Sequence, residues 1–258
     1  MVAINKFNVI TDATGLTKDD IKISEPVAPR AGGAGPTMMF INDKSGGKFR
    51  FQLNEAFAPF GASVYSDGKS DGKTSVDISF RNMEDNPQLK AVYDFVSIID
   101  ELMIQKGMDG LLGAKKSRDV IEELYRKSIK HHPEGKYAAN MKLGVTKDSS
   151  LFDKDKNKID ITPDNLPKGS QISLIFEISS AYKIGSRSYG VVIRLNQAKL
   201  SKSKNGPLPN FAFTYPDNDG DLEETEEAYQ PYSPTSSERE IANKVSEMSL
   251  DNTSENSA

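Results

Sequence analysis

The chain has 258 residues, of which 36% are hydrophobic, and a formal net charge of −4 at pH 7. It contains no cysteine, which excludes disulfides, thiolate zinc sites and thiol catalysis. The first residues form no apolar signal segment, and no run approaches the roughly 18 apolar residues of a membrane span. We therefore expect an intracellular protein that is neither secreted nor inserted in a membrane.

Charge is distributed unevenly along the chain. Residues 217–258 carry a net charge of −10, so residues 1–216 carry +6. A basic body with an acidic tail is typical of a body that binds a polyanion and a tail that competes with it or recruits partners. The alternative is a tail that only increases solubility. The polar, acidic composition of residues 217–258 predicts disorder.

The first clear β signal lies at residues 38–53. Residues 38–41 and 48–53 flank a glycine-containing turn and predict two strands joined as a hairpin. Alternation predicts a buried face of Phe49, Phe51 and Leu53 opposite an outward face that carries Lys48 and Arg50. The less favoured alternative inverts this parity, so that the two phenylalanines stack on bases.

Residues 66–74 contain two Gly-Lys-Ser/Thr tracts, but neither has the earlier glycine of a phosphate-binding loop. We expect a hairpin tip that carries Lys69 and Lys73. The strand that follows, residues 75–81, places Val76, Ile78 and Phe80 inward and Arg81 outward.

The apolar period then lengthens to about 3.6, which predicts a two-helix insertion at about residues 86–132. Asn86 caps the first helix, and glycines end it near residue 107. The second helix is predicted to begin at Ser117 and to end at His131 and His132, as partners of the helix dipole rather than metal ligands. No metal or other cofactor is expected.

Two further segments precede the last hairpin. Residues 137–145 are extended, with Met141, Leu143 and Val145 inward and Lys142 outward. Residues 153–157 resemble the start of a calcium loop but lack its turn glycine and its terminal glutamate, so a surface turn is favoured.

Residues 169–200 give the strongest signal, an antiparallel hairpin around which the chain is arranged. Two alternating runs flank a turn with Lys183 and Arg187, and Arg194 points outward. A protein that binds single-stranded nucleic acid needs aromatic rings and cations on a sheet with one solvent-exposed face. Tyr182 and Tyr189 are the candidates for stacking on bases.

An ordered set of short motifs carries a family resemblance. They are residues 46–52, 59–61, 79–80, 137–143, 152–155, 168–170, Tyr182 and 189–199. In this order they resemble the single-stranded DNA-binding protein family of the nucleocytoplasmic large DNA viruses, including those of algae and African swine fever virus. The resemblance covers roughly residues 20–205.

This resemblance implies an OB-fold-like barrel with helical insertions that binds single-stranded DNA in viral replication or repair, in the host cytoplasm or nucleus, without chemistry. The chain departs from the family pattern twice. Ala138-Ala139 follows Tyr137 where the family often has two prolines, and Tyr182 stands where it often has tryptophan. The smaller ring lowers the expected affinity.

Together these observations predict a mainly β (α+β) protein: an OB-fold-like antiparallel barrel in residues 1–216 and a disordered tail in residues 217–258. We expect a non-enzymatic, non-sequence-specific binder of single-stranded DNA, or of RNA, that recruits replication proteins through its tail and forms homo-oligomers. The predicted nucleic-acid-binding residues are Lys48, Arg50, Lys69, Lys73, Arg81, Lys142, Tyr182, Lys183, Arg187, Tyr189 and Arg194.

Two other function classes compete with this prediction. A nuclease needs clustered carboxylates for a metal ion, and Asp77, Glu84 and Asp85 form no recognisable motif. A viral scaffold or virion protein whose tail recruits partners would bind only protein. Salt-insensitive association, or no affinity for DNA, would favour the scaffold.

Overall fold

A computed structural model describes residues 2–29, 35–65 and 72–201. Lys69 and the acidic tail lie outside these residues. The described chain is mainly β with two α-helices, α1 (Pro87–Lys106) and α2 (Arg118–Leu124). Its short helical turns are η1 (Lys18–Asp20), η2 (Met83–Asp85) and η3 (Gly107–Leu111). Its strands are β1 (Ala3–Ile4), β2 (Ile10–Asp12), β3 (Lys22–Ile23), β4 (Thr37–Asn42), β5 (Phe49–Ala58), β6 (Ala62–Tyr65), β7 (Lys73–Ser79), β8 (Tyr125–Arg126), β9 (Ile129–Lys130), β10 (Asn140–Gly144), β11 (Ser150–Phe152), β12 (Lys158–Ile159), β13 (Ser170–Ile184) and β14 (Ser188–Leu200).

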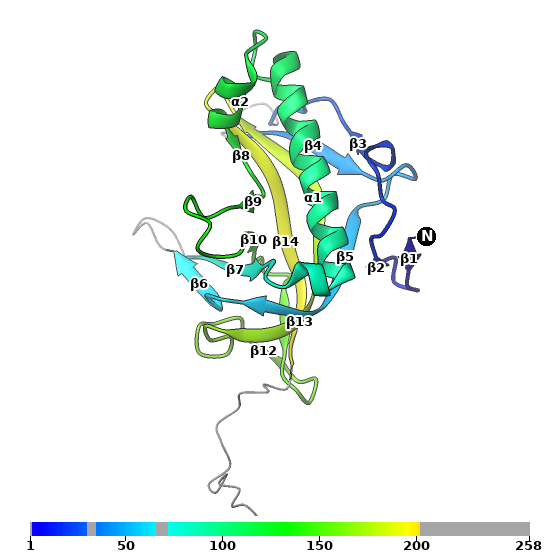
Figure 1. The fold of residues 1–258 in the computed structure, drawn as a ribbon, viewed down its shortest axis with the longest axis vertical. Helices are drawn as coiled ribbons and strands as arrows, with labels where there is room; N and C mark the ends of the chain where they lie inside the picture. The colour runs from blue at the N-terminus through cyan, green and yellow to red at the C-terminus, as the bar shows by residue number, and fades with distance from the viewer. Residues whose placement is uncertain (1, 30–34, 66–71, 202–258) are drawn as a thin grey trace, which may run out of the picture. The chain divides into compact units, whose positions relative to one another are not determined.

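The predicted hairpin of residues 169–200 is confirmed as β13 and β14, which pair along most of their length. On its other edge β13 pairs first with β5 and then, closer to the turn, with β4. β14 pairs on its other edge with β8, β10 and β11, all parallel to it. In Figure 1 the two strands run through the middle of the described fold, and α1 runs alongside them.

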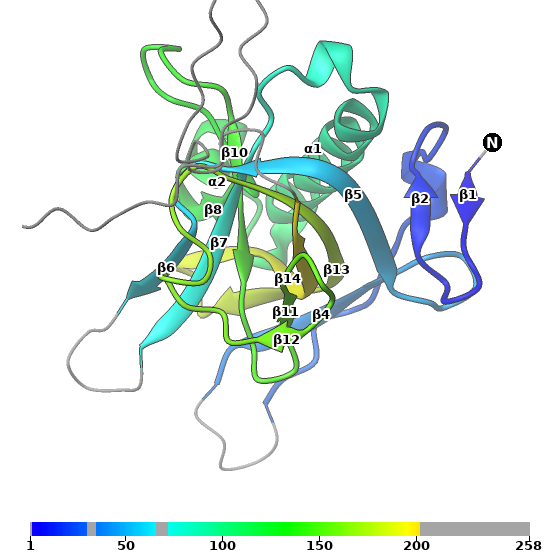
Figure 2. The same cartoon turned by 90° about the horizontal axis from the view of Figure 1, so that it is seen from below.

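Five of these strands form a closed ring in the order β5, β7, β10, β14 and β13, which returns to β5. Neighbours in the ring are antiparallel except β10 and β14. If the five strands are numbered by their position in the chain, their spatial order around the ring is 1-2-3-5-4. This is the order of the Greek-key barrel of the OB fold. The five strands lie together in Figure 2. The OB-fold-like α+β prediction is confirmed, and both helices lie between the second and third strands of the ring.

The predicted parity of the strands is also confirmed. Phe49, Phe51 and Leu53 are almost fully buried, and so are the alternating residues of β13 from Ile172 to Ile178. The ring centroid of Phe95 in α1 lies 4.9 Å from that of Phe49 and 5.3 Å from that of Phe51. The alternative in which the β5 phenylalanines face the nucleic acid is therefore wrong.

The hairpin predicted for residues 38–53 does not form. β4 and β5 both run antiparallel to β13 and follow one another along the same edge of it. The glycine-containing segment between them is a loop that projects from the edge of β13 and does not reverse the direction of the chain. A hydrogen bond from the Asp43 N–H to the Gly47 carbonyl closes this loop. Each strand pairs with β13 because β13 is long enough to hold both end to end.

The second helix is shorter than predicted. It ends at Leu124, and the chain then pairs with β14 as β8, so His131 and His132 do not lie at a helix end. The cause is Asp100 of α1, whose carboxylate accepts hydrogen bonds from the Tyr125 hydroxyl (2.6 Å) and from the hydroxyl and N–H of Ser128 (2.6 and 2.9 Å). Burial raises the pKa of Asp100, and these hydrogen bonds oppose that rise.

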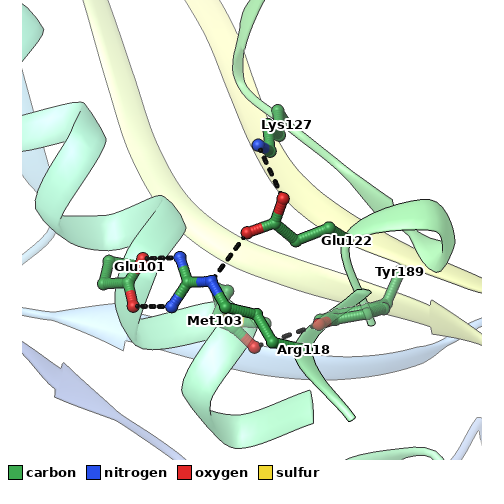
Figure 3. Close-up of polar contacts among 6 residues, drawn as sticks. All are labelled: Glu101, Met103, Arg118, Glu122, Lys127 and Tyr189. Carbon is green, nitrogen blue, oxygen red and sulfur yellow. Dashed lines mark hydrogen bonds and ion pairs between the residues drawn. The ribbon is translucent and has the colours of Figure 1, made fainter. Parts of the chain in front are cut away.

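Tyr189 is fully buried, so its predicted role in stacking on a base is wrong. Its hydroxyl donates to the Met103 carbonyl of α1 (3.2 Å), and burial raises its pKa to about 12. A Cβ on Gly107 would lie 2.2 Å from this hydroxyl, which explains the glycine where α1 ends. Nearby, Arg118 of α2 forms a bidentate ion pair with Glu101 of α1, and this pair connects the two helices (Figure 3). Arg118 also donates a hydrogen bond to Glu122 within α2.

Tyr189 offers a test of this arrangement. We expect Tyr189→Ala to lower the free energy of unfolding by about 3–5 kcal/mol, because it removes a buried ring between α1 and the hairpin. Tyr189→Phe keeps the ring and loses one hydrogen bond, which costs about 1 kcal/mol. Urea unfolding of the two variants measures both values. A Tyr189→Ala protein as stable as the wild type would contradict the buried position.

Candidate nucleic-acid interface

The outward-pointing side chains of the barrel form one continuous surface, here called the outer face. Successive side chains of a strand point to opposite sides, so Lys48 and Arg50 point away from the core that holds Phe49 and Phe51. One row of cross-strand partners crosses five strands of the outer face: Arg50, Glu177, Arg194, Gly144 and Ser75.

This row brings together cations that lie far apart in the sequence. Arg50 of β5 and Arg194 of β14 are both cross-strand partners of Glu177 in β13. Lys142 lies two residues before Gly144 on β10 and is exposed, so it shares the outer face with Arg194. Four of the predicted cations, Lys48, Arg50, Lys142 and Arg194, therefore lie on one surface.

Glu177 is a buried carboxylate at the centre of these cations. It is 5% exposed, and its oxygens lie 3.2 Å from the Lys48 Nζ and 3.4 Å from the Arg50 Nε. Burial raises the pKa of Glu177, but the hydrogen bonds and charges of Lys48, Asn196 and Arg50 outweigh burial and hold it below the ordinary value. The group is ionised near pH 7, and the half-exposed Lys48 and Arg50 keep further N–H donors for another anion.

Asn196 completes the surroundings of Glu177. Its amide Nδ2 donates to a Glu177 oxygen at 3.4 Å. Because an ionised carboxylate only accepts, this contact fixes which end of the amide points toward Glu177. The Asn196 Oδ1 is buried and accepts no hydrogen bond from the residues that the structure describes.

Tyr182 lies on the outer face beyond the barrel, near the turn of the hairpin. Its cross-strand partner is Gly190, and a Cβ on Gly190 would lie 3.1 Å from the Tyr182 hydroxyl. The absence of a side chain there lets the half-buried tyrosine lie across the strand next to Arg126. Phe40 of β4, about half exposed, points to the same side because Met39 and Ile41 on either side of it are fully buried.

The remaining predicted cations lie elsewhere. Lys183 is the cross-strand partner of Tyr189 and donates to the Leu111 carbonyl at the end of η3 (2.8 Å). Arg81 is exposed, with its guanidinium 3.3 Å from the ring centroid of Phe57. Lys73 is exposed at the start of β7 beside the exposed Tyr65, and Arg187 is exposed at the hairpin turn.

The outer face is hollowed next to Arg50. Two cavities of about 370 and 300 Å³ share Ile175 and Gln197 as lining residues. The first is also lined by Phe7 and Arg50, and the second by Phe152. The sequence did not predict either phenylalanine as a binding residue, because Phe7 lies in a turn and Phe152 ends a strand of three residues.

Among residues 2–29, 35–65 and 72–201, no three His, Cys, Asp or Glu side chains gather where they could hold a metal ion. Asp153 accepts hydrogen bonds from the backbone of Asp155 and Asn157, which confirms the surface turn predicted there. In the same residues, no helix is both long and apolar enough to cross a membrane.

Comparison with known proteins gives matches among solved structures alone. No protein-family profile and no curated protein matches the sequence. The single-stranded DNA-binding protein of bacteriophage Enc34 in complex with single-stranded DNA matches with a TM-score of 0.43 and 12% identity, over 64% of this chain and 90% of that one. A second structure of the same phage protein matches with a TM-score of 0.40 and 12% identity, over 72% of this chain and 97% of that one. Gp2.5, the single-stranded DNA-binding protein of bacteriophage T7, matches with a TM-score of 0.35 and 16% identity. The match covers 72% of this chain and 100% of that one.

These similar structures are single-stranded DNA-binding proteins of bacteriophages. None of them belongs to the nucleocytoplasmic large DNA viruses, so the more specific family resemblance stays a proposal. With identities of 12–16% and TM-scores below 0.5, they carry no inference about what this chain binds.

Glu177 predicts a pH dependence of stability. Its pKa is lower in the folded chain than in the unfolded chain, so its stabilising contribution is present above the unfolded pKa and is lost as the pH falls through the folded pKa. We expect Glu177→Gln to cost about 1–2 kcal/mol at pH 7 and less at pH 3.5. Urea unfolding at both pH values measures the difference.

The exposed Glu84 provides a control, because Glu84→Gln removes one surface carboxylate whose only contact is a 4.0 Å ion pair with Lys90 among the described residues. We expect this variant to stay within about 0.5 kcal/mol of the wild type. A Glu177→Gln cost that is the same at both pH values would contradict the depressed pKa.

Proposed function

We propose that this protein binds single-stranded DNA without sequence preference, on the outer face of its barrel. The observation that carries the proposal is the position of Arg50 and Arg194 on the strands that flank Glu177, with Lys48 beside Glu177 and Lys142 on the next strand, β10. OB folds bind oligonucleotides on the face of their second and third strands, here β7 and β10, and through the loops after the first and fourth strands. Lys142 lies on β10 and Arg187 in the loop after β13, whereas Arg50 and Arg194 lie on the adjoining first and fifth strands. Backbone phosphates are recognised by cations, and bases by aromatic rings, without regard to sequence.

The proposed interface extends beyond the four cations. Tyr182 and Phe40 offer rings on the same side of the sheet, and Arg187 and Lys73 offer charges at the hairpin turn and at the edge of β7. Lys69, which lies outside the described residues, stays a proposed contact. Arg81 stays a proposed contact at the end of β7.

The proposed role is to coat exposed single strands during replication, recombination or repair, without turnover, as the resemblance to the viral family implies. RNA is a second ligand of the same chemistry. The acidic tail is proposed to recruit replication proteins, and self-association along a strand is proposed as well. The scaffold hypothesis stands as the alternative if DNA does not bind.

The cations of the outer face give the direct test. Arg194→Gln and Lys142→Gln are suitable because neither residue forms an ion pair with Glu177. Lys142 faces the buried Asp77 across the strands, so the thermal unfolding midpoint of Lys142→Gln must also match that of the wild type. We expect each to weaken binding of a labelled oligo-dT roughly five- to tenfold and to reduce the slope of log K against log salt by about 0.7. Fluorescence anisotropy at several salt concentrations measures both quantities.

Lys90→Gln provides the matched control, because Lys90 lies on α1 and pairs there with Asp94. It should leave affinity and salt slope unchanged. A duplex of equal length should bind more weakly than the single strand. Absence of oligo-dT binding by the wild-type chain at low salt would remove the proposed function and favour the scaffold.

The charge split predicts a role for the tail. Residues 217–258 carry −10 against +6 on the rest, and we expect the tail to compete with DNA for the basic outer face. A chain ending at Pro216 should therefore bind oligo-dT more tightly than the full chain, with the largest difference at low salt. Equal affinities of the two chains would show that the tail does not compete.

A further inference from the structure

The groove beside Arg50 is lined partly by the core residues Leu174 and Ala198 and partly by apolar side chains outside the core. Ile175 forms its floor between the two cavities, while its neighbours Leu174 and Phe176 are buried in the core. Phe7 lines one cavity and is 70% exposed. Phe152 lines the other and is half-buried. Phe7, Phe152 and Ile175 do not belong to the hydrophobic core.

The polar side chains that line this groove suit a ligand that has both a negative charge and a flat ring with hydrogen-bonding groups. Three of the lining side chains, Arg50, Lys156 and Lys199, are cations, and none of the lining residues is acidic. Gln52, Gln197 and Asn196 add amides that both donate and accept. Apolar walls, amides and a positive rim together suit a nucleobase joined to a phosphate.

The groove is continuous with the proposed phosphate-binding cations. Arg50 lines it and is also an ion-pair partner of Glu177, beside Lys48 and Arg194. Pockets of about 300–1,000 Å³ hold drug-sized ligands, so cavities of about 300 and 370 Å³ have room for one base each.

We infer that this groove receives bases of the bound strand, with Phe7 and Phe152 as stacking residues at its two ends. The inference rests on the proposed function, because the phosphates of the same strand lie on Arg50 and its neighbours. It adds a base-binding site on β5, β13 and β14 that Tyr182, at the far end of the hairpin, does not reach.

The test separates contacts to bases from contacts to phosphates. The full-length chain is titrated with labelled oligo-dT and with an abasic deoxyribose-phosphate strand of the same length and charge. We expect Phe7→Ala and Phe152→Ala each to weaken oligo-dT binding roughly tenfold. Both variants should leave affinity for the abasic strand, and the salt slope, within about twofold of the wild type.

Conservative variants protect the test against misfolding. Phe7→Leu and Phe152→Leu keep the groove apolar but remove the ring, so they should lose oligo-dT affinity in the same direction while keeping the wild-type thermal unfolding midpoint. Val120→Ala, at an exposed apolar position on α2, should change neither affinity.

Four outcomes would overturn the inference. Equal losses on both strands would mean that the rings act through the fold or the phosphates. Unchanged oligo-dT affinity, with loss of self-association in sedimentation, would assign the groove to a second copy of the chain. A wild-type chain that binds neither strand would remove the proposed function itself, whereas normal wild-type binding with unaffected variants would remove this site alone.

Discussion

The fold depends on one constraint, the need of the long β13–β14 hairpin to pair along both of its outer edges. An unpaired strand edge exposes a row of N–H and C=O groups, and here 15 and 13 residues are involved. β5 and β4 cover one edge end to end, and β8, β10 and β11 cover the other. Because β5 and β10 also meet through β7, covering both edges closes the barrel.

The hairpin is longer than the barrel that it closes, and this excess length explains the helical insertion. Toward the turn, Tyr189 of the hairpin donates to the Met103 carbonyl of α1, while Phe95 of α1 packs on Phe49 of β5. Tyr189 and Tyr182, in neighbouring cross-strand pairs, consequently have opposite environments. Tyr189 packs under α1, and Tyr182 lies on the side that the proposed nucleic acid occupies.

The sequence predicted those features that depend on local alternation. The buried residues of β5, β7, β10 and β13 and the outward cations Lys48, Arg50 and Lys142 all follow from a period of two. The features it failed to predict depend on distant partners. A glycine turn has the same composition whether it reverses the chain or, as between β4 and β5, does not. The end of α2 is decided by Asp100, and the position of Lys183 by the Leu111 carbonyl, 72 residues away.

Glu177 gives the proposed interface a property that a purely basic surface would lack. The carboxylate already satisfies part of the charge of Lys48 and Arg50 and holds both side chains in place, so they lose less conformational freedom when an anion arrives. A phosphate must compete with the carboxylate, so binding yields only the difference between the two interactions. Cations arranged in this way favour an encounter that is rapid, weakened by salt and readily reversed. A protein that coats a template strand and must then leave it requires that kind of binding.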